Sequence, residues 1–154
     1  MSTKQRRKRK SFFRHHSLSI VAGAILAMWI GSYSLSDPNN HLGSLFGNAI
    51  ADWTGVVLTV VATKYLYEKG SAESRQPAHE PKNPLHRFLL DHSLVIFLLI
   101  TGAGWTALYL RVDTEGKWGQ VVGNIVSEWT QLIGLVLLTK KLVEQHSKES
   151  AGKG

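Results

Sequence analysis

The residues with the clearest chemical potential are two acids, each preceded by an asparagine four positions earlier. Asn48 is followed by Asp52, and Asn124 is followed by Glu128. Residues four apart lie one turn apart on the same helix face, so each amide would stand beside a carboxylate. An ionisable group inside an apolar helix is by default a site for cation coordination or proton transfer. These four residues are therefore the candidate ion or proton site.

Further polar residues extend these two faces or lie on the preceding helices. The row of polar residues on this helix face continues without interruption after Asp52, but after Glu128 the apolar Leu135 interrupts it. The possible supporting residues are Thr59, Thr63, Gln131, Thr139, Tyr33 and Tyr109. A structural alternative is that both acids sit in the first turns of their helices, where the positive end of the helix dipole favours a carboxylate. Asn48 or Asn124 would then cap the helix.

The elements that carry these residues come from an internal duplication with an offset of 76 positions. Residues 12–74 align without a gap on residues 88–150, and 22 of the 63 paired positions are identical. The matches that flank the apolar runs are His-Ser-Leu at 16–18 and 92–94, Thr-Lys at 63–64 and 139–140, and glutamate at 68 and 144. A repeat of this kind fixes the architecture before any single element is assigned.

Two long uncharged runs predict helices that cross a membrane. Residues 18–36 and 93–110 contain no charged side chain, and about 20 apolar residues suffice to span a bilayer. The runs around Asp52 and Glu128 each carry a single acid near one end, followed by a lysine that can snorkel to the surface. We expect an all-α, multi-pass membrane protein with four transmembrane helices, arranged as two tandem hairpins with pseudo-two-fold symmetry.

Charge placement predicts the orientation of these four helices. The segments 1–14, 64–87 and 140–154, which lie on one side of the predicted helices, together hold 16 of the 18 Lys and Arg residues, and the two opposite loops hold only Arg111 and Lys117. Because Lys and Arg accumulate on the cytoplasmic side, both termini are expected in the cytoplasm. The basic tail is expected to contact anionic lipid head groups.

The expected organisation divides the chain into two membrane repeats and three connecting or terminal segments. The segments are a basic, irregular tail at 1–11, repeat 1 at 12–74 with helices at about 16–36 and 45–67, a cytoplasmic linker at 75–87, repeat 2 at 88–150 with helices at about 85–111 and 119–145, and a tail at 151–154. The His-Ser pairs at 16–17 and 92–93 are expected to cap helices at the membrane surface.

Several classes of function find no support in the sequence. The chain has no cysteine, which removes thiolate catalysis and cysteine-based metal sites. The seven histidines do not fall at the spacings typical of zinc ligands. We find no nucleophile–base arrangement, phosphate loop or nucleic-acid-binding pattern, so we expect no catalytic residue, metal, cofactor or nucleic-acid partner.

The stretch from Trp53 through Lys69-Gly70-Ser71-Ala72-Glu73-Ser74, together with its duplicate, resembles a family of uncharacterised small bacterial integral membrane proteins. The shared features are a basic start, an Asn, acid and Trp cluster in the second helix, and a Gly-Ser-x-Glu-Ser segment after it. The resemblance implies a bacterial inner-membrane location and no particular activity.

These observations predict a non-catalytic structural or accessory component of the bacterial envelope. The alternative is a small cation or proton channel or transporter that uses Asp52 and Glu128. Because four short helices leave little room for a substrate cavity, a homo-oligomer would suit the alternative.

Overall fold

The computed structural model describes residues 3–74, 77, 81–140 and 142, and every regular element in these residues is an α-helix. The helices are α1 (Thr3–Leu35), α2 (His41–Tyr65), α3 (Pro84–Asp91), α4 (Ser93–Tyr109) and α5 (Lys117–Leu138). The expected tail at 151–154 lies outside the described residues. The chain divides into two compact units, Met1–Val60 and Val61–Gly154.

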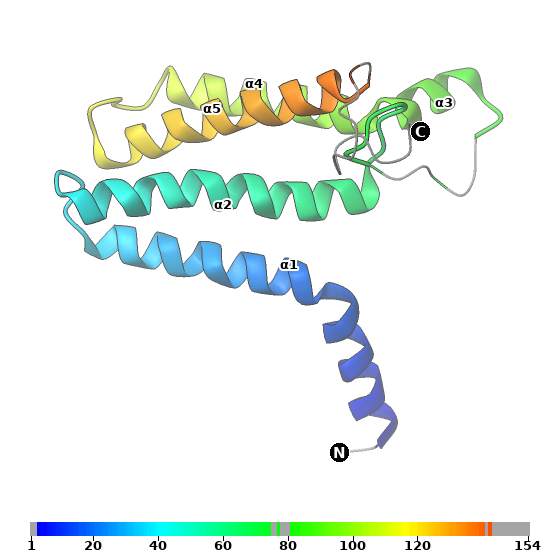
Figure 1. Cartoon of the computed structure of the whole chain (residues 1–154), viewed down its shortest axis with the longest axis horizontal. Helices are drawn as coiled ribbons and strands as arrows, with labels where there is room; N and C mark the ends of the chain where they lie inside the picture. The colour runs from blue at the N-terminus through cyan, green and yellow to red at the C-terminus, as the bar shows by residue number, and fades with distance from the viewer. Residues whose placement is uncertain (1–2, 75–76, 78–80, 141, 143–154) are drawn as a thin grey trace. The chain divides into compact units, whose positions relative to one another are not determined.

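The first helix begins earlier than expected. α1 starts at Thr3 and includes the basic segment (Figure 1), so the prediction of an irregular tail at 1–11 is wrong for residues 3–11, which are helical. The physical reason is that lysine, arginine and glutamine are good helix formers. No glycine or proline interrupts the chain before Gly23.

Each hairpin turn depends on a glycine that lets two backbone segments approach closely. A Cβ at Gly43 would overlap the carbonyl oxygen of Asp37, and a Cβ at Gly119 would overlap that of Asp113. Asn40 also accepts a hydrogen bond from the Gly43 N–H at 2.7 Å. The two turns therefore share the same local packing at duplicated positions, while the overall pseudo-two-fold symmetry stays a prediction.

One turn further into each hairpin, a tyrosine ring packs on a glycine. A Cβ at Gly47 would lie 3.2 Å from the Tyr33 ring, and one at Gly123 would lie 3.0 Å from the Tyr109 ring. These contacts bring the helices close where each hairpin turns. In this way the duplicated Tyr and Gly residues set the spacing of α1 from α2 and of α4 from α5.

Helices α4 and α5 pack side by side (Figure 1). The buried side chains of this pair are Leu94, Leu98, Val121, Val122, Ile125, Trp129 and Val136. The Trp129 indole N–H donates to the Thr101 hydroxyl at 2.9 Å. A Cβ at Gly102 would lie 3.1 Å from the same indole ring, so this glycine makes room for the tryptophan.

The single helix expected at 85–111 is instead two helices. α3 and α4 meet at His92 with a bend of 64°, and α3 begins inside the expected linker at 75–87. His92 has a non-helical backbone, with φ −124° and ψ 16°. The bounds of α2 differ from expectation by a few residues. α5 ends at Leu138, so the described positions 139, 140 and 142 of the expected fourth helix are not helical, and its positions 141 and 143–145 lie outside the described residues.

Three helical segments in the described part of the chain are long and apolar enough to cross a membrane: His16–Leu35, His41–Tyr65 and Lys117–Leu138. The number rises to four if α3 and α4 together form one broken span. The structure thus confirms an all-helical protein with three to four candidate membrane spans. The side of the membrane on which each terminus lies stays a prediction.

Candidate functional site

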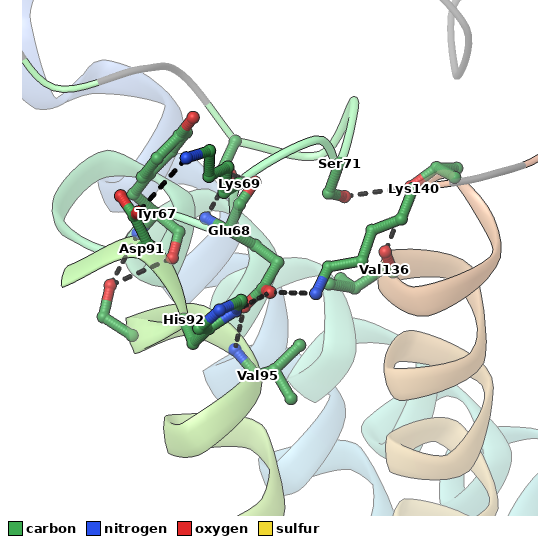
Figure 2. Close-up of polar contacts among 12 residues, drawn as sticks. Tyr67, Glu68, Lys69, Ser71, Asp91, His92, Val95, Val136 and Lys140 are labelled. Carbon is green, nitrogen blue, oxygen red and sulfur yellow. Dashed lines mark hydrogen bonds and ion pairs between the residues drawn. The ribbon is translucent and has the colours of Figure 1, made fainter. Parts of the chain in front are cut away.

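The most deeply buried charged group in the described residues is the carboxylate of Glu68, which follows α2. Its side chain is 0% exposed. One carboxylate oxygen, Oε1, lies 2.7 Å from His92 Nδ1 and also pairs with the ammonium group of Lys140. The other oxygen, Oε2, accepts the Val95 N–H at 3.1 Å. We call Glu68, His92 and Lys140 the Glu68 junction (Figure 2).

The segment before Glu68 also caps the start of α4. The carbonyl oxygen of Tyr67 accepts the Leu94 N–H at 3.1 Å. The Ser93 hydroxyl accepts the Tyr67 N–H at 2.8 Å and donates to the Tyr67 carbonyl at 3.0 Å. The first N–H groups of a helix have no acceptor within the helix, and a carboxylate there also meets the positive end of the helix dipole. The bend at His92 therefore exposes N–H groups that Tyr67 and Glu68 satisfy.

The loop after Glu68 is fixed to α5 as well as to α4. Ser71 and Thr139 share a buried hydrogen bond of 2.9 Å between their hydroxyls. The Glu68 N–H donates to the Ser74 hydroxyl at 2.8 Å. Between them, Gly70 has a backbone φ of +83°, a conformation that favours glycine over residues with a side chain. The Glu68 junction therefore ties together the loop after α2, the start of α4 and the end of α5.

Around this junction lies a more exposed set of charges. Asp91 lies 3.6 Å from the Lys69 ammonium and 3.9 Å from Arg87 Nε, and both cationic side chains are about half exposed. The Lys69 N–H also donates to the Asp91 carbonyl at 2.7 Å. Exposed pairs of this kind contribute little to stability. We therefore expect the buried Glu68 carboxylate, and not these exposed pairs, to matter most for the stability of the site.

The predicted ion site is placed differently on the two helices. Asn48 and Asp52 lie on α2 as exposed side chains, whereas Asn124 and Glu128 are half-buried on α5. Glu128 Oε1 accepts a hydrogen bond from Gln131 at 3.3 Å. The amide side chain of Gln131 thus contacts the acid within α5, while the ion-binding role of all four residues stays a prediction.

The supporting residues of that prediction have varied surroundings. Thr139 belongs to the loop contact with Ser71 beside the Glu68 junction. Thr59 and Thr63 are half-buried on α2. The rings of Tyr33 and Tyr109 pack against Gly47 and Gly123.

The helix-end interpretation of the two acids is wrong. α2 begins at His41 and α5 at Lys117, so Asp52 and Glu128 each lie 11 residues beyond the first residue of the helix. The stabilisation of a carboxylate by the helix dipole falls off within the first turn. Both acids therefore sit in the middle of apolar helices.

Sequence reasoning did not identify Glu68, His92 and Lys140 as one site. His92 was expected to cap a helix, and it occupies the N-cap position of α4 without a side-chain cap hydrogen bond; its ring nitrogen contacts Glu68. The available signal was the duplication, because the polar residues that flank the apolar runs occur in both repeats. What the sequence could not show is that residues 68, 92 and 140 converge on one carboxylate.

The fold and this site define a class: an all-helical protein with three to four candidate membrane spans, whose buried Glu68, Ser71 and Thr139 side chains are hydrogen-bonded within the chain. Comparisons with protein-family models, curated proteins and solved structures found no match. The resemblance to small bacterial membrane proteins therefore stays a prediction. Among the residues that the structure describes, no group of three or more His, Cys, Asp or Glu side chains could hold a metal ion.

Proposed function

We propose that this protein is a non-catalytic, multi-pass component of the bacterial inner membrane with a structural or accessory role in the envelope. The observation that carries the proposal is the Glu68 junction. Both carboxylate oxygens of this buried residue are bonded to groups of the same chain. A buried charge satisfied in this way holds helices together.

The proposal includes a membrane orientation and a lipid partner. Sixteen Lys and Arg residues fall in the segments assigned to the cytoplasm and two fall in the opposite loops, which supports cytoplasmic termini. The seven Lys and Arg residues at positions 4–14 suit anionic lipid head groups. The lipid bilayer is therefore the first partner that we assign.

Topology reporters test this orientation. A green fluorescent protein fused after Gly154 should fluoresce in bacterial cells, and alkaline phosphatase fused there should be inactive. The same phosphatase inserted between α4 and α5, at residues 112–116, should be active because this loop is assigned to the opposite side. Phosphatase activity at the C-terminal fusion would contradict the orientation.

A second candidate function rests on the position of Asp52 and Glu128. Each acid is about three turns inside an apolar helix, where an ionisable group is costly and typical of ion or proton pathways. A small cation or proton channel or transporter, assembled as a homo-oligomer, would use these acids together with Asn48 and Asn124. The placement of the acids favours this alternative over a helix-end role.

Flux measurements in proteoliposomes separate the two functions. For a structural component we expect no proton, sodium or potassium flux above that of protein-free vesicles. Flux in the wild type that Asp52→Asn with Glu128→Gln abolishes would establish the channel or transporter instead. Glu115→Gln is the matched control, because this acid lies exposed in the turn before α5 and its neutralisation should leave any flux unchanged.

A further inference from the structure

The short helix α3 presents an apolar face that no part of the described chain buries. None of its eight residues is buried. Leu85, Phe88 and Leu89 are 68%, 57% and 47% exposed, and their spacing places them on one side of the helix. His86 and Arg87 occupy other sides. α3 is therefore an amphipathic helix whose apolar face is largely exposed, although the Phe88 ring contacts the His92 ring, with 4.8 Å between the ring centroids.

α3 is capped at its start by a local hydrogen bond and is joined at its end to the loop after α2. At its start, Asn83 caps the helix by accepting the Leu85 N–H at 3.0 Å. At its end, the Asp91 carbonyl accepts the Lys69 N–H at 2.7 Å, and the Glu68 junction follows directly at His92. These contacts maintain the 64° bend between α3 and α4, so the apolar face of α3 is held away from the axis of α4.

The position of α3 indicates what covers this face. α4 is an uncharged helix of 17 residues, about 25 Å long at 1.5 Å per residue, and it joins α3 through His92 alone. If α4 crosses the bilayer near its normal, a helix inclined at 64° to it lies closer to the plane of the membrane, at the level of the head groups. An amphipathic helix at this level buries its apolar side about 5–10 Å into the boundary between head groups and acyl chains.

We infer that α3 is an interfacial anchor whose Leu85, Phe88 and Leu89 insert into the surface layer of the same bilayer that α4 crosses. The inference rests on the proposed membrane location of α4. Charge supports lipid as the occupant, because Lys69 and Arg87, which pair with Asp91 and are about half exposed, lie at the end of α3, where anionic head groups attract basic residues. Direct continuity with α4, which counts as a candidate span together with α3, supplies the second argument.

Spin labelling tests this anchor cleanly, because the chain contains no cysteine. Single cysteines at Leu85 and Leu89 report the apolar face, and one at His86, which lies about 100° from Leu85 around the helix axis, reports the polar side that flanks it. A cysteine at Leu99, which is exposed on α4, reports whether α4 is in the membrane. Each full-length variant is labelled with a nitroxide and reconstituted in vesicles of phosphatidylethanolamine and phosphatidylglycerol. Collision rates with oxygen and with a water-soluble nickel chelate then give the depth.

We expect the labels at Leu85 and Leu89 to lie about 5–10 Å below the phosphates, the label at His86 to be accessible from water, and the label at Leu99 to be deep. Water access at all three α3 positions, with Leu99 deep, would overturn the anchor while leaving the membrane location intact. Equal depth for the labels at His86 and Leu89 would show that α3 is part of a broken membrane span, and this result would also overturn the interfacial anchor. Water access at Leu99 would refute the membrane location itself.

Dilution of the protein in the vesicles excludes another occupant. Spin–spin broadening at Leu89 that disappears when the lipid-to-protein ratio is raised would show that a second copy of the chain covers the face, and this result would overturn the assignment to lipid. A depth at Leu89 that is independent of this ratio supports it. Because the labels at Leu85 and Leu89 report independently, failure of one variant to fold leaves the other as the test.

Discussion

Lys140→Met should lower the free energy of unfolding by about 3 kcal/mol, because it leaves the carboxylate of Glu68 buried without its permanent cation. Glu68 is 0% exposed, and Lys140 Nζ pairs with its Oε1. His92 remains on the same oxygen, so we expect a loss near the lower end of the range for broken buried pairs. Unfolding by sodium dodecyl sulfate in dodecylmaltoside micelles, followed by tryptophan fluorescence, measures the change.

The double variant Glu68→Gln with Lys140→Met identifies the cause of that loss. Neutralising Glu68 removes the unpaired charge, so the double variant should be more stable than the sum of the two single effects predicts. Lys69→Met is the matched control, since its side chain is 59% exposed and lies 3.6 Å from Asp91; we expect a change of no more than about 0.5 kcal/mol. Equal losses for Lys69→Met and Lys140→Met would contradict a special role for the Glu68 junction.

The positions of the long helices could be predicted from the sequence because the signal is local. Uncharged runs such as 93–110 are visible in the chain, and their length decides between a span and a buried helix. Turn-forming residues after Ser36 and after Val112 mark the ends of these helices. The bounds of α1 were less predictable, since a basic segment of good helix formers reads equally well as a tail or as a helix.

The bend at His92 was not predicted, although the His-Ser pair at 92–93 was expected to cap a helix. No proline or glycine lies at 85–101, so the sequence favours one continuous helix. The structure breaks it because Tyr67 and Glu68, more than 20 residues earlier, accept the N–H groups of Leu94 and Val95. The Glu68 junction was missed for the same reason, as its three members come from separate elements. Tertiary contacts of this kind override local propensity.

The duplication carries more information about the turns than about the candidate ion site. Gly43 and Gly119 are identical because a backbone carbonyl occupies the space of a side chain in both hairpins. By contrast, Asp52 and Glu128 are retained as acids but differ in exposure, one being exposed and the other half-buried. The backbone geometry of the turns therefore explains why glycine occurs at both positions. The presence of an acid at both 52 and 128 would be explained instead by a need for a charge inside the two helices.

Gly119→Ala should cost about 3 kcal/mol, because the added methyl group would overlap the carbonyl oxygen of Asp113 and lie 2.8 Å from the Asp113 carbonyl carbon. These are backbone atoms of the turn, so the clash cannot be relieved by rotating a side chain, and overpacking of this kind reaches the upper part of its usual range. The same micelle unfolding assay measures the loss. Gly43→Ala, which would meet Asp37 in the other hairpin, should reproduce it.

Gly134→Ala is the matched control for Gly119→Ala, since it makes the same substitution on the same helix. A Cβ at Gly134 would meet no atom within 4 Å. Alanine is favoured over glycine in a helix interior by about 1 kcal/mol, so this variant should be slightly more stable than the wild type. The opposite signs at positions 119 and 134 separate a steric requirement of the turn from a general effect of replacing glycine. Equal effects at both positions would show that the close approach of Gly119 to Asp113 does not hold the hairpin together.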